Sequence, residues 1–158
     1  MKLPLHLPLL ALAACGYAQG FIGDDMGIRT LAIRTVENGS FRQDMDILLS
    51  RRLSRDLSAF TGFVPASPSQ ADGILEVEIL DARGRLITEE AEGKIKEGAI
   101  RLSARYRILD RRSGRILRKG RSLDWAEFRV PVGEDQSSAI REAVTDLSRK
   151  ILLSLQDR

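Results

Sequence analysis

The sequence has one histidine and one cysteine among its 158 residues, and aromatic side chains make up only 5% of it. His6 and Cys15 both lie near the N-terminus, so the chain after them has no imidazole and no thiol. This absence excludes Ser-His-Asp and Cys-His catalysis and the usual zinc sites from the rest of the chain. We therefore expect neither a metal nor another cofactor.

Catalysis by a pair of carboxylates is still possible with this composition. The pairs Asp24-Asp25 and Glu89-Glu90 lie in segments whose sequence predicts flexible loops. A catalytic carboxylate pair needs rigid placement and shifted pKa values. The sequence therefore predicts a protein that is not an enzyme, and a small hydrolase is retained only as a remote alternative.

Long hydrophobic runs are absent, except for a short one from Leu3 to Ala14 that follows Lys2. This run is shorter than the ~20 residues of a membrane-spanning helix, and Pro4 and Pro8 interrupt it. A basic start, an apolar run and small residues before a cleavage site are typical of a secretory signal. The alternative, a core segment with a buried cysteine, fits the extreme N-terminal position poorly.

The signal ends in Leu12-Ala13-Ala14-Cys15, which has the pattern of a lipobox, the substrate of the bacterial lipoprotein pathway. We expect cleavage after Ala14, a diacylglyceryl group on the Cys15 thiol and acylation of the new amino terminus. Several acyl chains hold a protein on a membrane almost permanently. Gly16, in place of aspartate after the cysteine, fits sorting to the outer membrane. The predicted segments are 1–14 as signal peptide, 15–27 as lipidated N-terminus and tether, and 28–158 as one domain.

Two amphipathic helices are predicted. Ser40 to Gln43 fits a capping box before a first helix that ends at Thr61-Gly62, and a second helix is predicted from Asp135 to Leu155. Strands are predicted over Ile28–Val36, Gly73–Asp81, Ala99–Leu109 and Arg115–Phe128, the last with a bulge near Gly120. Residues 63–72 are expected to be irregular with at most a short edge segment, and residues 82–98 to form a long hairpin or a flexible loop.

The element order β-α-β-β-β-α predicts an α+β fold. Alternating apolar and polar residues in the strands are typical of a half-buried antiparallel sheet. We expect two helices packed on one face of a four-stranded, mainly antiparallel sheet.

Positive charge is concentrated in one region of a chain whose net charge is only +3. Nine arginines and lysines lie between Arg101 and Arg121, against the single acid Asp110. Such a patch attracts anions, and guanidinium groups on one sheet face suit phosphates. The proposed ligand-binding residues are Arg101, Arg105, Arg107, Arg118 and Arg121, with Arg115 as a further candidate on the hairpin partner.

An alternative interpretation of this patch is a solvated face whose arginines form ion pairs with Glu76 and Glu78 on the neighbouring strand. Nucleic acid is not an expected partner, because the signal takes the chain out of the cytoplasm.

Several short motifs resemble those of the LptE family, lipopolysaccharide-assembly lipoproteins of Gram-negative outer membranes, in a divergent short form. These motifs are Cys15-Gly16-Tyr17, Leu31-Ala32-Ile33 leading to Glu37-Asn38, Ala71 to Leu75, Tyr106 to Asp110 with Ser113-Gly114, and the C-terminal amphipathic helix. The segment 82–98 is more charged than is usual in this family, and the first strand ends in Arg34-Thr35-Val36 where a proline or aromatic residue is usual.

The resemblance implies the same β-α-β-β-β-α architecture and a non-catalytic role. It implies that the protein plugs the LptD β-barrel in the outer membrane and helps to deliver lipopolysaccharide to the outer leaflet. Another lipoprotein adaptor of similar fold, such as a peptidoglycan-synthase activator or a secretin pilot, remains an alternative.

Overall fold

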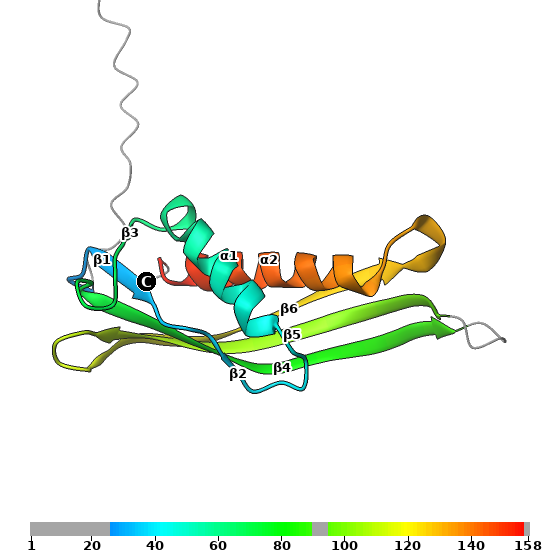
Figure 1. Cartoon of the computed structure of the whole chain (residues 1–158), viewed down its shortest axis with the longest axis horizontal. Coiled ribbons are helices and arrows are strands. Elements are labelled where there is room, and N and C mark those ends of the chain that lie inside the picture. Colours follow the sequence, from blue (N-terminus) through cyan, green and yellow to red (C-terminus); the bar gives the residue numbers. More distant parts are fainter. Residues whose placement is uncertain (1–25, 90–94, 157–158) are drawn as a thin grey trace, which may run out of the picture.

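The computed structural model describes residues 26–89 and 95–156, and both helices lie on one side of a single sheet (Figure 1). The α+β prediction is therefore confirmed. The predicted signal, Cys15 and almost all of the tether lie outside the described residues. The elements are β1 (Thr30–Ile33), β2 (Glu37–Asn38), α1 (Met45–Phe60), β3 (Val64–Pro65), β4 (Gly73–Glu89), β5 (Ile95–Asp110), β6 (Ile116–Arg129), the 3₁₀ helix η1 (Val130–Val132) and α2 (Gln136–Ser154).

The sheet is six-stranded in the order β3-β1-β4-β5-β6, with β2 also paired to β4. The β4-β5-β6 meander is antiparallel, whereas β1 runs parallel to both β3 and β4. The sheet is thus mainly antiparallel, as predicted. The two additional strands, β2 and β3, have two residues each, and β3 is a short edge segment of the kind that the prediction for residues 63–72 allowed.

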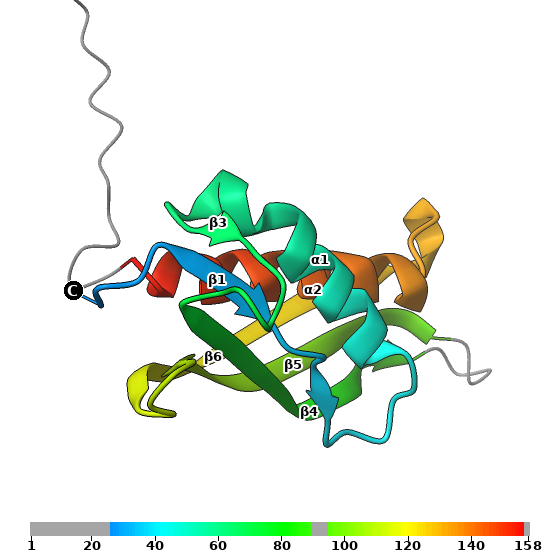
Figure 2. The ribbon, with the colours of Figure 1, turned by 60° about the vertical axis from the view of Figure 1, so that its left-hand side comes forward.

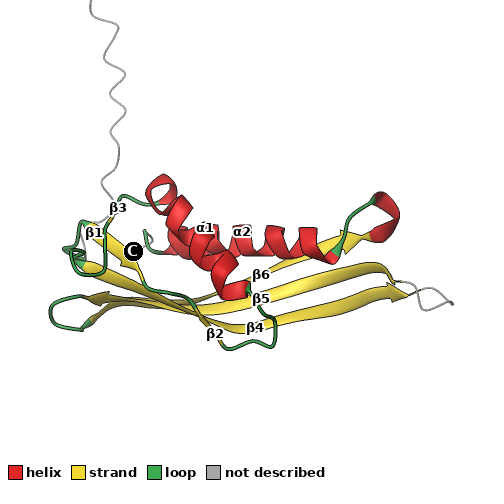
Figure 3. Cartoon of the chain, viewed as in Figure 1, coloured by secondary structure: helices red, strands yellow, loops and turns green. Residues whose placement is uncertain are grey.

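The long β4-β5 hairpin extends beyond the ends of both helices (Figure 3). Of the two interpretations of residues 82–98, the long hairpin is the one that the structure supports in the described part. The alternation of apolar and polar residues does not continue simply from residues 73–79 into residues 82–98. The reason is a register shift between Ile79 and Asp81, which inserts Leu80 as an extra residue. Beyond it, the small residues Ala82 and Gly84 lie opposite Leu102 and Ile100, where larger apolar residues are usual.

The core lies between the sheet and the helices. The apolar residues that alternate with polar ones in β4 (Leu75, Val77, Ile79) and in β5 (Leu102, Ala104, Tyr106, Ile108) are all buried, as are Leu49, Leu53 and Leu57 of α1 and Leu147 and Ile151 of α2. Figure 2 shows α1 and α2 crossing above the strands. Each helix therefore has one apolar face toward the sheet, as the sequence periodicity indicates.

The two helix starts differ in how well the sequence predicted them. For α2, the Ser138 N–H donates to Asp135 Oδ1 at 2.7 Å, and the helix begins directly after this cap. For α1, the predicted capping box is wrong. The Ser40 hydroxyl instead donates to Asn38 Oδ1 at 2.7 Å and closes a turn, and the helix begins at Met45 after Asp44, whose φ of 65° is left-handed.

Strand β6 forms one edge of the sheet, and side chains satisfy part of its outward backbone. Lys150 Nζ donates to the Leu123 carbonyl at 3.2 Å, and the Trp125 N–H donates to Asp124 Oδ1 at 2.8 Å. The Arg129 N–H donates to Glu134 Oε2 at 2.8 Å. These contacts occupy backbone N–H and C=O groups that another strand could otherwise pair with.

Candidate ligand groove on the open sheet face

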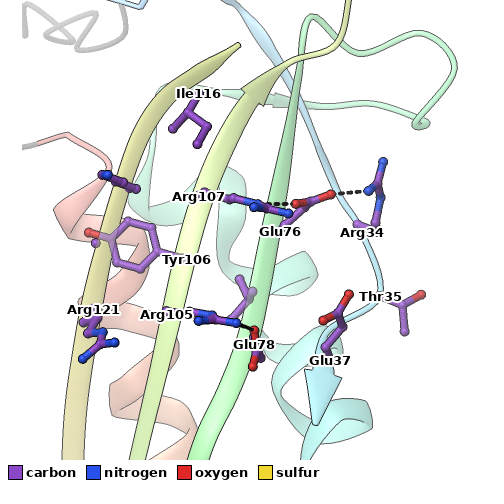
Figure 4. A pocket seen from close by; sticks show the side chains of 13 residues that line it. Arg34, Thr35, Glu37, Glu76, Glu78, Arg105, Tyr106, Arg107, Ile116 and Arg121 are labelled. Carbon is purple, nitrogen blue, oxygen red and sulfur yellow. Dashed lines mark hydrogen bonds and ion pairs between the residues drawn. The ribbon is translucent and has the colours of Figure 1, made fainter. Parts of the chain in front are cut away.

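A groove of about 710 Å³ lies on the sheet face opposite the helices. It extends from the β1-β2 connection across β4 and β5 to β6, and Figure 4 shows the side chains that line it. Most of its lining residues are charged. They are Arg34, Glu37, Glu76, Glu78, Arg105, Arg107, Lys119 and Arg121.

Strand register arranges these charges in two rows across the sheet. One row contains Glu76 on β4, Arg107 on β5 and Lys119 on β6. The next row contains Glu78, Arg105 and Arg121. Because residues two apart on a strand point to the same face, the rows are about 7 Å apart. Each row thus begins with a carboxylate and continues with two cations.

Ion pairs hold the arginines of β5 against β4. Arg107 Nε donates to Glu76 Oε2 at 2.6 Å, and Arg105 Nε donates to Glu78 Oε2 at 2.6 Å. Arg34 pairs with Glu76 from the other side, so one carboxylate serves two guanidinium groups (Figure 4). The alternative interpretation of the basic patch expected ion pairs with Glu76 and Glu78, and these ion pairs are present.

These ion pairs orient the arginines more than they stabilise the fold. The side chains of Arg105 and Arg107 are 57% and 56% exposed, and ion pairs at such positions typically contribute about 0–1 kcal/mol. A guanidinium group has five N–H donors in a planar fork. Each arginine therefore still has donors available for an additional anion.

Two cations of the groove have no carboxylate partner in the described part of the chain. Among residues 26–89 and 95–156, neither Lys119 nor Arg121 forms an ion pair, whereas Glu76 and Glu78 are already paired. The groove contains five cations and three carboxylates. Its β6 side consequently carries the positive charge that can attract an anionic ligand.

The structure brings together three of the five predicted ligand-binding arginines. Arg105, Arg107 and Arg121 line the groove. Arg101 lies on the same face, opposite Trp125 on β6, but outside the groove lining. Arg118 is on the helix side of the sheet, where its Nη1 donates to the Ser154 carbonyl at 3.2 Å.

Sequence reasoning missed Lys119 and Arg34 as groove residues. The bulge predicted in this strand is present, but it lies at Leu117 and not at Gly120, because the register shift between Ile108 and Leu109 of β5 leaves Leu117 as the extra residue of β6. From Arg118 onward β6 alternates regularly, which places Lys119 beside Arg121 on the open face. Gly120 is needed for packing instead, because a Cβ there would lie 2.3 Å from the Tyr106 hydroxyl oxygen.

Two further observations concern the described part of the chain. No group of three or more His, Cys, Asp or Glu side chains there is arranged to hold a metal ion. None of the helices among these residues combines the length and the hydropathy that crossing a bilayer requires.

Solved structures of low sequence identity share this fold. PelC from Paraburkholderia phytofirmans, described as a dodecamer, has a TM-score of 0.59 at 15% identity, covering 83% of this chain and 89% of that one. A putative lipoprotein from Caulobacter crescentus has a TM-score of 0.52 at 22% identity, covering 77% and 88%. A minor lipoprotein from Acinetobacter baumannii has a TM-score of 0.53 at 18% identity, covering 82% and 91%.

Sequence comparison gives the family. No curated protein is significantly similar to the chain. The family model LptE, described as lipopolysaccharide-assembly, matches residues 28–155, which include β1 to α2 and every charged residue of the groove. The chain therefore belongs to the LptE family of lipopolysaccharide-assembly proteins.

Proposed function

We propose that this protein is an outer-membrane lipoprotein, anchored through acylated Cys15, that acts as an assembly partner of an LptD β-barrel. In this role it helps to deliver lipopolysaccharide to the outer leaflet. The observation that carries the proposal is the family match over residues 28–155. The lipobox at Leu12 to Cys15 supports the anchoring independently of that match.

The groove is the proposed contact for lipopolysaccharide. Lipid A and the inner core carry phosphates, and planar guanidinium groups bind phosphates with two parallel hydrogen bonds. Arg105 and Arg107 are held in place by Glu78 and Glu76, so little side-chain freedom is lost when a phosphate binds. Arg121 and Lys119 add unpaired charge, and Arg101 extends the basic face. Arg118 lies on the opposite face and is not part of this proposed contact.

The role is proposed to be non-catalytic. The carboxylates Glu76 and Glu78 of the groove are already engaged by guanidinium groups of arginines. General acid-base catalysis needs a carboxyl group that can reach the proton it transfers on the substrate. The chemistry of the groove therefore suits electrostatic binding better than proton transfer.

Isolation from outer membranes tests the partnership. The acylated full chain, carrying a C-terminal affinity tag, is extracted in mild detergent and its companions are identified by mass spectrometry. We expect a large LptD-type β-barrel in near-equal amount, because a plug remains in its barrel. A chain without a tag serves as the control for non-specific capture.

The same experiment separates the alternatives. Recovery of a peptidoglycan synthase or of a secretin, with no barrel of the LptD type, would contradict the proposed function and favour an adaptor role. Recovery of the barrel in substoichiometric traces that the untagged control also shows would contradict it as well.

A further inference from the structure

One end of the domain is both basic and next to the point where the chain leaves toward Cys15. The start of β1 and the turn between β5 and β6 lie at the same end of the molecule in two views (Figures 1 and 2). The end of β4 at Glu89, the start of β5 at Ile95 and the helix η1 lie at the opposite end. The domain therefore has a proximal and a distal end relative to the predicted anchor.

Hydrogen bonds to Ala71 and Asp72 connect the turn to the start of β1. The Arg111 N–H donates to the Asp72 carbonyl at 2.9 Å, and Arg111 Nε donates to the Ala71 carbonyl at 2.6 Å. Asp72 Oδ2 in turn accepts from the N–H groups of Arg29 and Thr30 at 3.1 and 3.0 Å. The two segments consequently form one continuous surface.

This surface, which we call the basic end, consists of exposed Arg29, Arg111, Arg112 and Arg115 together with Val64 and Ile116. Val64 and Ile116 are apolar yet 59% and 48% exposed. Val64 lies beside β1, since its N–H donates to the Arg29 carbonyl at 3.0 Å. Arginines interspersed with exposed apolar side chains are typical of surfaces that bind a membrane interface.

The carboxylates at the basic end, Asp72 and Asp110, already accept hydrogen bonds from nearby residues. Hydrogen bonds from Thr30 and Arg29, together with the charge of Arg112, lower the pKa of Asp72. Hydrogen bonds from Ser113, with the charge of Arg115 as a smaller cause, lower the pKa of Asp110. Four arginines therefore face two carboxylates that are already hydrogen-bonded, and the surface keeps a net positive charge.

We propose that the basic end rests on the phosphate headgroups of anionic phospholipids in the bilayer that holds the acyl chains of Cys15. The inference depends on the acylation of Cys15, but it does not depend on the barrel partnership. Cys15 precedes Met26 by eleven positions, so a fully extended connection spans at most about 40 Å. Anchoring thus confines the basic end to the neighbourhood of the headgroups, where each arginine is attracted to an anionic surface.

A fluorescent label tests this contact in vesicles that contain neither barrel nor lipopolysaccharide. Because acylation consumes Cys15, the only native cysteine, Ser69→Cys provides a single thiol in the loop that leads to Asp72. The labelled, acylated protein is reconstituted in phosphatidylcholine with a nitroxide headgroup quencher, with or without phosphatidylglycerol. We expect quenching to be at least about twofold stronger with phosphatidylglycerol.

Matched charge reversals show whether the basic end is responsible. Arg112→Glu with Arg115→Glu should remove the effect of phosphatidylglycerol, because two attractive charges become repulsive. Arg51→Glu with Arg55→Glu, on the exposed side of α1, changes the net charge equally and should leave the effect intact. A label at Ser137→Cys, at the start of α2 near the distal end, should be quenched weakly in both lipid mixtures.

Equal quenching in the two lipid mixtures would overturn the inference, and so would strong lipid dependence that survives Arg112→Glu with Arg115→Glu. A mass spectrum without acyl groups on Cys15 would overturn it too, because nothing would then hold this end near a bilayer. Failure to recover a barrel, by contrast, would contradict the proposed function and leave this result unaffected.

Discussion

Cys15→Ala is expected to abolish both acylation and processing of this protein. The chain has no second cysteine that could accept the diacylglyceryl group, and an unmodified precursor is not cleaved after Ala14. Each buried methylene of an acyl chain contributes roughly 0.8 kcal/mol, so losing several chains removes essentially all anchoring. Metabolic labelling with palmitate and the mass of the mature protein measure the effect, which should be all or none.

Ala14→Gly is the matched control, because it keeps a small residue before the cleavage site and should allow normal processing. If Cys15→Ala yielded a mature-sized protein, the lipobox interpretation would be wrong.

Reversing both β5 arginines of the groove, Arg105→Glu with Arg107→Glu, is expected to weaken lipopolysaccharide binding by about 10- to 100-fold. A hydrogen bond to a charged group is worth about 1.5–3 kcal/mol, and the new carboxylates would also face Glu78 and Glu76. The fold should survive, because the exposed ion pairs that are lost contribute only about 0–1 kcal/mol each. Pull-down with immobilised lipopolysaccharide measures binding, and thermal unfolding checks the fold.

Two further variants separate ligand contact from ion pairing. Arg121→Glu removes a groove cation while both β4-β5 ion pairs remain, and it should weaken binding on its own. Exchanging partners, with Glu78→Arg and Arg105→Glu, keeps the net charge and restores a pair, so binding should recover relative to Arg105→Glu alone. If binding were unchanged in the double reversal and in Arg121→Glu, the groove would be a solvated sheet face that does not contact lipopolysaccharide.

Sequence periodicity predicted the elements whose apolar residues follow a simple repeat. The amphipathic character of α2, its start near Asp135, and the alternation of Leu75, Val77 and Ile79 are all confirmed. These features depend on local pattern and burial, which a single sequence carries directly.

The features that the sequence failed to predict depend on partners distant in the chain. Leu80 and Leu117 are extra residues only in relation to the opposing strand, so neither bulge could be located by alternation alone. Ser40 has the residue types of a capping box, but Asn38 engages its hydroxyl in a turn before α1. The parallel pairing of β1 with β3 and β4 likewise has no local signature.

The candidate groove was predicted in outline. Arg105 and Arg107 alternate with the apolar residues Ala104, Tyr106 and Ile108, and this pattern predicted that they lie on the open face. Arg34 of the β1-β2 connection and Glu37 of β2 reach the groove only because β1 and β2 run beside β4. Lys119 joins the groove because of the bulge at Leu117. A site assembled from several strands is thus predictable from sequence only where charged residues alternate with apolar ones along one strand.

The most direct test of the account is the amount of lipopolysaccharide on the cell surface when the chain is depleted. Surface labelling of intact cells should show a loss of lipopolysaccharide on depletion. The wild-type chain should restore it, whereas Cys15→Ala should not. Surface lipopolysaccharide that stays constant after complete depletion would contradict the central claim that this protein serves lipopolysaccharide assembly.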